Sequence, residues 1–380
     1  MQAATKNQSI TPFLVMDVLE KANALAAQGR EVIHLEVGEP DFDTPACIRS
    51  ACARALEGGM THYTHSMGIP ELREAICEHY ARTYGVSVDP GQVVVTAGSS
   101  PALFIAMACL AGTGDEIIMT DPYYACYPNF ARVIGASPRL IPTGSADGFQ
   151  LDPDKVRNAR GPASKAVVIN SPANPTGICL DDDHLRALAD LSLPIISDEI
   201  YHGMVYAGSQ HTILEYTDRA VVINGFSKAY AMTGWRLGWA VFPKSLVRTA
   251  QKLQQNIMIC APAPAQWAGI SALTEAGPEV ERMRNIFAQR RLVMLEELAR
   301  HGFNVEVEPH GAFYVLVNMS HVTNDSYRLA MDILENTGVG VTPGEDFGPG
   351  GEGYLRFSYA NSEHNIREGV SRVAAYLKSL

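Results

Sequence analysis

The sequence predicts an α/β protein with a mostly parallel central sheet flanked by helices, followed by a smaller α+β unit. Short apolar runs alternate with helix-length segments through the middle of the chain, which is the rhythm of βαβ units. Beyond a long amphipathic stretch at 279–301, this rhythm gives way to several strands and a single helix. The length of 380 residues also exceeds one ordinary domain.

The apolar periodicity predicts the elements in order. In the large unit we expect strands at 93–96, 116–119, 166–170, 194–197, 220–224 and 237–242. Helices are expected between them at 102–110, 124–134, 182–191 and 244–259. The smaller unit is expected to hold strands at 305–307, 312–317 and 354–359 and a helix at 327–337.

Composition argues against several classes of protein. The formal net charge is -11 and no basic stretch could follow a phosphate backbone or an anionic membrane, so we expect no nucleic acid or membrane partner. The seven cysteines lack C-x-x-C spacing, which is typical of reduced thiols. Residues 1–11 lack the apolar core of a secretory signal, so we expect a cytoplasmic protein. No zinc-type spacing surrounds His62 and His65, and no metal is expected.

The segment 344–353 is rich in glycine and invites comparison with a dinucleotide-binding loop. Such a loop follows a strand directly and opens a helix. Neither element is expected at its ends, so the sequence disfavours a nicotinamide-dependent enzyme.

Lys228 lies just beyond the expected strand 220–224, at the edge where open α/β sheets place their ligands. A loop lysine is by itself usually solvated. A partly desolvated lysine, however, loses its proton more readily, and a neutral amine attacks an aldehyde carbon. Ser227 precedes it, and Arg236 follows eight residues later, where a guanidinium can bind a phosphate with two hydrogen bonds.

Two other polar motifs occur near strand ends. Asp198 follows the expected strand 194–197 and precedes Tyr201. A carboxylate there can keep a pyridine nitrogen protonated, although an aspartate that caps a turn is an equally good interpretation. Asn174 lies in the Ser-Pro-Ala-Asn-Pro-Thr-Gly cluster at 171–177, which composition alone explains as a turn.

Gly98, Ser99 and Ser100 join the expected strand 93–96 to the helix expected from 102. A serine N-cap at Ser100 followed by Pro101 explains them as helix capping. The N-terminus of a helix after a strand is also a ready anion site. Both interpretations stay open at this point.

Two more residues have both a purely structural and a functional interpretation. Tyr124 follows the expected strand 116–119 and is either a core tyrosine or a ring that stacks on a ligand. Arg356 lies on the alternating strand 354–359 and points away from Leu355 and Phe357. An exposed arginine is the usual interpretation of that pattern.

Taken in chain order, these motifs resemble the class I/II aminotransferase family, whose members use pyridoxal 5'-phosphate (PLP) and have PLP fold type I. The resemblance extends from about Ile33 to Tyr359, and the segment 224–236 is long and specific. It departs at Gly225, where the family often has a serine that bonds the phosphate. We accordingly divide the chain into an N-terminal segment 1–45 that contributes to the small domain, a large PLP-binding domain 46–280 and a small C-terminal domain 281–380.

The resemblance implies a role for each residue. Lys228 would hold the cofactor in a Schiff base and move protons, Asp198 would pair with the pyridine nitrogen, and Tyr201 would bind the ring oxygen. The rest of the cofactor would lie on Gly98, Ser99, Ser100, Tyr124, Asn174, Ser227 and Arg236, with Tyr63 reaching in from a neighbouring subunit of a homodimer. The substrate carboxylate would lie on Gly38, Asn174 and Arg356.

The implied activity is ping-pong transfer of an amino group between an L-amino acid and a 2-oxo acid. Elimination, as in the carbon-sulfur lyases of the same fold, is the nearest alternative. A non-catalytic PLP-binding regulator is a second one. Regulators of this type normally carry an N-terminal DNA-binding domain, and only about thirty residues precede the first motif.

The sequence also favours an amino donor with an uncharged side chain, because a buried second carboxylate needs a cation. Dicarboxylate-specific relatives often carry that cation after the long helix or in the phosphate loop. Here the stretch 253–280 has no lysine or arginine, and the loop position is Ser100. Phe13 and Val15 are expected in an apolar pocket, whereas Lys252 and Arg282 are the cations that could still accept a dicarboxylate.

Overall fold

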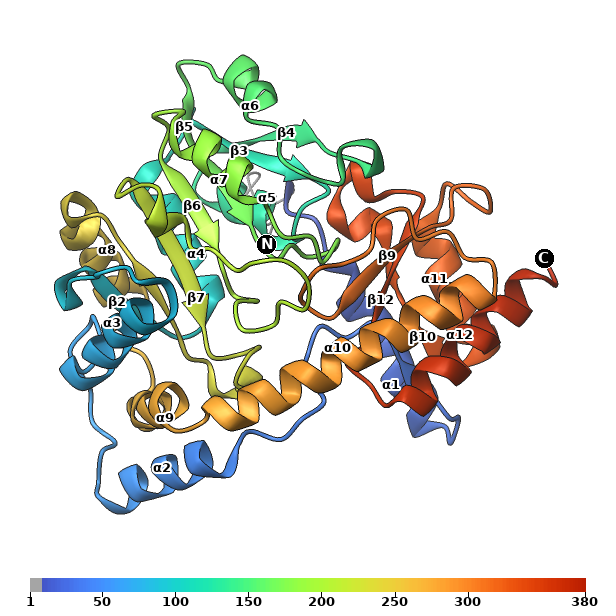
Figure 1. Ribbon diagram of the computed structural model, residues 1–380, viewed down its shortest axis with the longest axis horizontal. Coiled ribbons are helices and arrows are strands. Elements are labelled where there is room, and N and C mark those ends of the chain that lie inside the picture. Colours follow the sequence, from blue (N-terminus) through green and yellow to red (C-terminus); the bar gives the residue numbers. More distant parts are fainter. Residues whose placement is uncertain (1–8) are drawn as a thin grey trace, which may run out of the picture.

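The computed structural model describes residues 9–380, and its largest element is a seven-stranded sheet (Figure 1). The strand order is β2-β8-β7-β6-β5-β3-β4. The strands are β2 (Val93–Thr96), β3 (Glu116–Asp121), β4 (Ser137–Pro142), β5 (Ser164–Asn170), β6 (Ile195–Asp198), β7 (Ala220–Gly225) and β8 (Gly238–Val241). The strands from β7 to β4 run parallel, and β8 is antiparallel to both its neighbours. The predicted mostly parallel sheet is confirmed.

Helices cover both faces of this sheet, which is why its central strands are almost continuously apolar. Successive residues of β5 belong to different clusters, with Val167 in one core and Val168 in the other. One face packs against α3 (Pro70–Tyr84), α7 (Asp182–Ala189) and α9 (Ala263–Thr274). The other packs against α4 (Ser99–Leu110), α5 (Cys126–Val133) and α8 (Lys244–Ile257). Helices α2 (Ala46–Glu57) and α6 (Pro153–Ala159) lie further out (Figure 1).

A smaller three-stranded sheet, in the order β11-β12-β9, lies at the other end of the molecule (Figure 1). Its strands are β9 (Tyr314–Asn318), β11 (Thr342–Pro343) and β12 (Tyr354–Ser358), and α11 (Ser326–Thr337) and α12 (Glu363–Leu377) accompany them. Helix α10 (Gly277–Arg300), 24 residues long, connects α9 to this unit. Helix α1 (Leu14–Ala27) packs on α11, and β1 (Ile33–His34) pairs with β10 (Val339–Gly340). The domain boundaries themselves stay a prediction.

Several local expectations were wrong. No strand forms at 305–307, where the only pairing is an isolated bridge between Asn304 and Asn318. Helix α4 begins at Ser99 with Gly98 as its N-cap, so Ser100 is not the cap. Strand β4 was missed because it is a half-exposed edge strand with proline at two positions. The glycine-rich segment does follow a strand, β11, and opens with a short 3-10 helix η6 (Gly344–Phe347). Its last glycine leads into β12 and not into a helix, so the objection to a dinucleotide loop holds.

The register of the large sheet brings functional residues to one edge. Asn170 of β5 lies opposite Asp198 of β6, which lies opposite Ile223 of β7. Lys228 follows three residues after β7 ends. Parallel strands that end together present their following loops at one place, and that edge is where such sheets bind ligands.

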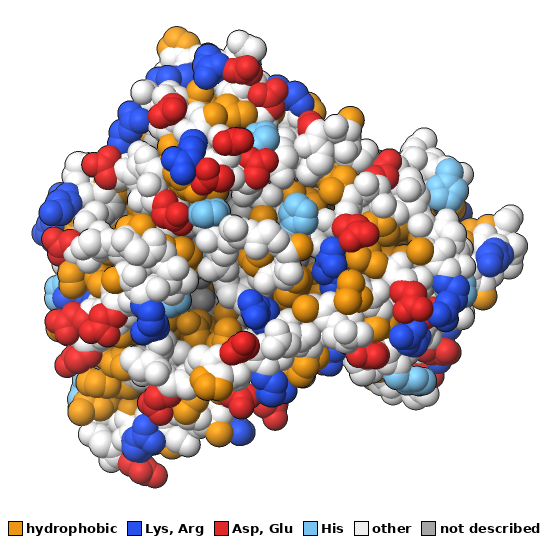
Figure 2. All heavy atoms as spheres, viewed as in Figure 1, with side chains coloured by type: hydrophobic (Ala, Val, Ile, Leu, Met, Phe, Trp, Pro, Cys, Tyr) orange, Lys and Arg blue, Asp and Glu red, His pale blue; other side chains and the backbone are white. Residues whose placement is uncertain are grey.

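The surface and the thiols agree with the composition. On the face shown in Figure 2, basic and acidic side chains are interspersed over most of the area. All seven cysteines are free thiols. Within residues 9–380 no helix combines the length and apolar character that crossing a membrane requires, and no cluster of three metal-ligating side chains occurs. The cytoplasmic location and the absence of a nucleic acid partner stay predictions.

Candidate active site

A cavity of about 380 Å³ opens at this edge of the sheet. It gathers residues from segments that are far apart in the sequence, from the start of α1 to β12. All but two of the site residues predicted from the sequence line it, namely Gly38, Ser99, Ser100, Tyr124, Asn174, Asp198, Tyr201, Ser227, Lys228, Arg236 and Arg356. The two exceptions are Gly98 and Tyr63.

Gly98 lies directly behind the cavity, against Arg236. It has a φ of 104°, and a Cβ at this position would come within 2.6 Å of the Arg236 guanidinium. Arg236 itself has a φ of 53°, which is an unfavourable conformation for a residue with a side chain. Such strain often marks functional sites. The backbone therefore brings the free N–H groups at the start of α4 next to a guanidinium, which makes an anion-binding cradle.

Lys228 extends into the middle of the cavity. Its Nζ donates a hydrogen bond to the backbone oxygen of Gly38 at 2.5 Å and lies 5.9 Å from the ring centroids of Tyr201 and Phe313. Burial lowers the pKa of the amine to about 8, against a smaller opposing effect of Glu39. About a tenth of the amine is therefore neutral at pH 7, and nucleophilic attack and proton transfer require this neutral form.

Asp198 lies on the cavity wall with its carboxylate held from two sides. Its Oδ1 accepts a hydrogen bond from the Ile200 N–H at 3.2 Å, and its Oδ2 accepts one from the Tyr127 hydroxyl at 2.7 Å. Burial raises the pKa of Asp198 to about 6, and these two hydrogen bonds oppose that rise. The carboxylate is therefore mostly ionised above pH 6, and a cation facing it would hold it ionised at lower pH.

Arg356 is buried, with 2 % of its surface exposed, so the alternative interpretation as an ordinary exposed arginine is wrong. One Nη donates to the side-chain oxygen of Asn174 at 2.8 Å, and the other donates to the backbone oxygen of Glu36 at 2.7 Å. No carboxylate of residues 9–380 forms an ion pair with it, and its Nε has no hydrogen-bond partner there. A buried cation without an anion is costly, so this guanidinium is prepared to bind an anionic ligand.

Comparison with known proteins agrees with this geometry. The family model described as aminotransferase class I and II matches residues 30–373. The chain belongs to the class I and II aminotransferase family. It is 40% identical over 370 residues to a (5-formylfuran-3-yl)methyl phosphate transaminase of Methanocaldococcus jannaschii, covering 96% of each chain. It is 39% identical over 378 residues to an aspartate/prephenate aminotransferase of Thermus thermophilus, covering 97% of each.

The fold gives the same result. The crystal structure of an aminotransferase from Mycobacterium tuberculosis superposes with a TM-score of 0.95 at 36% sequence identity, and the match covers 100% of both chains. The protein is thus a PLP-dependent transaminase with PLP fold type I. The site fits PLP: the cradle of α4 and Arg236 suits a phosphate, Asp198 suits a pyridinium nitrogen, and Lys228 suits an aldehyde carbon.

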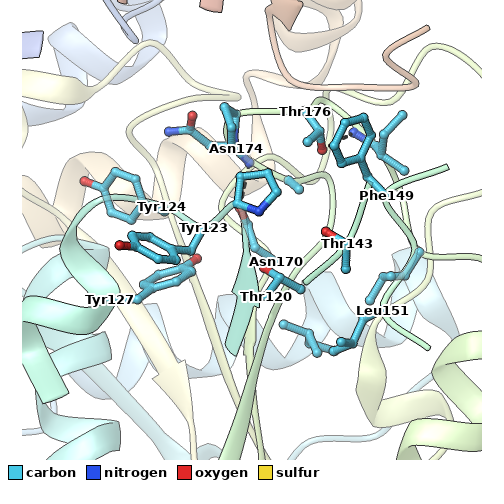
Figure 3. A pocket seen from close by; sticks show the side chains of 16 residues that line it. Thr120, Tyr123, Tyr124, Tyr127, Thr143, Phe149, Leu151, Asn170, Asn174 and Thr176 are labelled. Carbon is cyan, nitrogen blue, oxygen red and sulfur yellow. Dashed lines mark hydrogen bonds between the residues drawn. The ribbon is translucent and has the colours of Figure 1, made fainter. Parts of the chain in front are cut away.

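Two contributors to this aminotransferase site were not predicted from the sequence. The Tyr314 hydroxyl lies 2.8 Å from that of Tyr201, and the Tyr314 ring centroid lies 4.2 Å from the Arg356 guanidinium. The second is Tyr127, the partner of Asp198. Tyr127 lines a separate cavity of about 30 Å³ (Figure 3). Tyr124, Asn170 and Asn174 line both this cavity and the main one. The alternating pattern of β9 places Tyr314 on a strand, but only the fold brings it to Arg356.

Tyr63 does not reach the cavity of its own chain, and 81 % of its surface is exposed. Lys252 and Arg282 do not line the cavity either. Arg282 pairs with Glu279 at 2.9 Å and lies over the Phe42 ring. Within one chain, neither cation is placed to accept a second substrate carboxylate.

The Tyr127 hydrogen bond has a testable effect on pH dependence. In Tyr127→Phe the Asp198 carboxylate loses a donor, so its pKa rises and the carboxylate takes up a proton at higher pH. We expect the acid limb of the kcat/KM profile to move to higher pH by about one unit, as for one hydrogen bond to a charged group, so kcat/KM should fall more at pH 6 than at pH 7.5. Tyr123→Phe is the matched control, since Tyr123 lines the same small cavity. An unmoved acid limb in Tyr127→Phe would show that this bond does not control Asp198.

Proposed function

We propose that this aminotransferase moves an amino group from an L-amino acid with an uncharged side chain to a 2-oxo acid, by a ping-pong mechanism. The observation that carries the proposal is the wall of the cavity. Phe13, Val15, Met16 and Leu19 form an apolar surface on one side. Among the residues 9–380 that line the cavity, the only cations are Lys228, Arg236 and Arg356. The first two are assigned to the cofactor and the third to the substrate α-carboxylate, so none of the three is left for a second carboxylate.

In the proposed mechanism, bound PLP supplies an aldehyde that exchanges amino groups and a ring that accepts electrons. Arg356 and Asn174 hold the substrate carboxylate and so orient the Cα–H bond. Lys228, as a neutral amine, would remove the Cα proton and deliver it to the carbon that carried the cofactor's aldehyde oxygen. Asp198, held by Tyr127, keeps a negative charge against the ring nitrogen, and Tyr201 donates to the ring oxygen while Tyr314 fixes its position.

Elimination would use every one of these groups, although the family and the named relatives identify the chain as a transaminase. A lyase would convert a cysteine conjugate and water to pyruvate, ammonia and the free thiol, without any 2-oxo acid acceptor. A non-catalytic binder would leave the cofactor spectrum unchanged by any amino acid. A transaminase consumes a 2-oxo acid acceptor, a lyase releases a thiol and a binder forms no product, so one product assay separates the three.

The donor preference is tested by measuring kcat/KM for aspartate, glutamate, alanine, leucine, methionine and phenylalanine with common 2-oxo acid acceptors. We expect an uncharged donor to lead and aspartate to be at least about a hundredfold poorer, because an unpaired buried carboxylate costs several kcal/mol. Lys252→Ala and Arg282→Ala are controls for a hidden cation and should leave the order unchanged. Aspartate at the head of the series would contradict the proposal.

We also propose a homodimer whose two sites each use Tyr63 of the other subunit. Gln266 donates hydrogen bonds to the Thr64 side chain and to the Ala261 backbone, so the exposed Tyr63 lies near the end of α8. There Ile257, Met258 and Ile259 are also exposed, and a contiguous apolar surface of this kind marks a protein interface. Sedimentation should give twice the 41.2 kDa of one chain, and Tyr63→Ala should weaken PLP binding. A fully active monomer at micromolar concentration would exclude this arrangement.

A further inference from the structure

The first turn of α1 forms a wall of the cavity without a cap of its own. Phe13, Val15 and Met16 line the cavity, and the Phe13 ring meets the Tyr124 ring edge to face at 6.0 Å. Phe13 is the N-cap residue, and its side chain makes no capping hydrogen bond. The backbone N–H groups that begin this helix therefore need a partner from elsewhere in the chain.

Asp346, in η6, is that partner. Its Oδ1 accepts a hydrogen bond from the Leu14 N–H at 2.8 Å, and its Oδ2 accepts one from the Val15 N–H at 3.2 Å. The side chain is buried, with 6 % exposed. Burial raises the pKa of Asp346 to about 6, against the two N–H donors, so the carboxylate is mostly ionised at pH 7.5. A negative charge at this place also matches the dipole of the helix.

The same short segment touches the arginine that is placed to bind the substrate carboxylate. The ring of Phe347, the next residue, lies 5.0 Å from the Arg356 guanidinium. The backbone oxygen of Phe347 accepts a hydrogen bond from the Tyr123 N–H at 3.0 Å, which fixes the segment against the large sheet. One element therefore contacts both the apolar wall and the anion-binding group.

The hydrophobic contacts of α1 lie mostly beyond its first turn. Val18, Ala22 and Leu25 pack on Leu334, whereas Val15, the buried residue of the first turn, lies on the cavity wall. The chain before α1 is attached at Thr11, which bonds to Asn129 of α5 at an exposed position. Exposed hydrogen bonds contribute little to stability, so the Asp346 carboxylate is the buried polar contact that holds the first turn in place.

We propose that Asp346 is a positioning residue for substrate specificity: it sets the distance between the apolar wall of α1 and Arg356, and thereby selects the side chain of the ligand. This proposal rests on the assignment of Arg356 in the proposed function. Ligands that reach from Arg356 to the wall depend on Asp346, whereas ligands that are too short for the wall do not.

The test uses two unreactive carboxylates, 3-phenylpropanoate and acetate, titrated calorimetrically into the PLP-loaded protein. We expect Asp346→Ala to raise the Kd of 3-phenylpropanoate about tenfold, as for a lost helix cap, and to leave the Kd of acetate within about twofold of the wild-type value. Asp346→Asn keeps the shape and one acceptor oxygen, so its effect should be smaller, about threefold. Asp17→Asn removes an exposed charge from the same turn and should change neither ligand. The cofactor absorbance should be the same in all variants.

Several results would overturn the proposal. An equal loss of affinity for both ligands would mean that Asp346 acts on Arg356 alone. Unchanged affinity for both ligands in both Asp346 variants would mean that packing, and not the carboxylate, holds the wall in place. If Asp346→Ala does not fold, Asp346→Asn carries the same comparison. A wild-type protein that binds neither carboxylate would refute the assignment of Arg356 as well, which distinguishes failure of the proposed function from failure of the role of Asp346.

Discussion

Replacement of Lys228 by alanine should lower kcat by at least about 10⁴-fold, because it removes both the nucleophilic amine and the proton-transfer group. The fold should persist. Lys228 makes one hydrogen bond, to Gly38, and burial makes its charged form unfavourable, so the loss of the amine removes little favourable energy. Circular dichroism and a denaturant midpoint close to that of the wild type would check this.

Borohydride provides a second measurement of the same residue. Reduction of the PLP-loaded wild type should attach the cofactor covalently to the peptide that contains Lys228, as read by peptide mass. Lys252→Ala is the control, since Lys252 lies outside the cavity and should label and turn over normally. Attachment at any other lysine would refute the assignment, whatever the activity of Lys228→Ala.

Replacement of Arg356 by methionine should raise KM for the amino donor and lower kcat/KM by roughly a hundredfold or more, since removal of one partner from a buried charged contact costs about 2–5 kcal/mol. Arg356→Lys keeps the charge but loses the planar guanidinium that donates to Asn174 and Glu36 at the same time. Its kcat/KM should therefore be at least about tenfold lower than that of the wild type. PLP affinity should change little, because the proposed phosphate cradle is formed by Arg236 and the start of α4, away from Arg356.

The control for this series is Arg372→Lys. Arg372, on α12, pairs with Glu368 of the same helix and with Glu31, which precedes β1, and it does not line the cavity. Both its kcat/KM and its cofactor spectrum should match the wild type. If Arg356→Met lowered kcat and left KM unchanged, the guanidinium would serve the chemical step and not substrate binding.

The sequence predicted the chemical groups of this site better than it predicted the contacts that shape the site. The spacing of Lys228 and Arg236 and the polar residues near the ends of apolar strands were enough to place Asp198 and Lys228 at one sheet edge. This inference follows from the parallel direction of the strands, because the loops after neighbouring parallel strands lie at the same edge of the sheet. The sequence did not show Tyr127 as the donor to Asp198, because a helical tyrosine three residues after Tyr124 has the same pattern as a core residue.

What the sequence determined by itself was therefore local: which runs form strands, which residues end them, and which family these motifs resemble. Only the tertiary structure decided that Arg356 is buried without an anionic partner in the described chain, although its strand alternates as an exposed one would. Only the tertiary structure joined Asp346 to Leu14, 332 residues apart. Periodicity reports which face of an element is apolar, whereas the choice of partner across such a distance follows from packing of the whole chain.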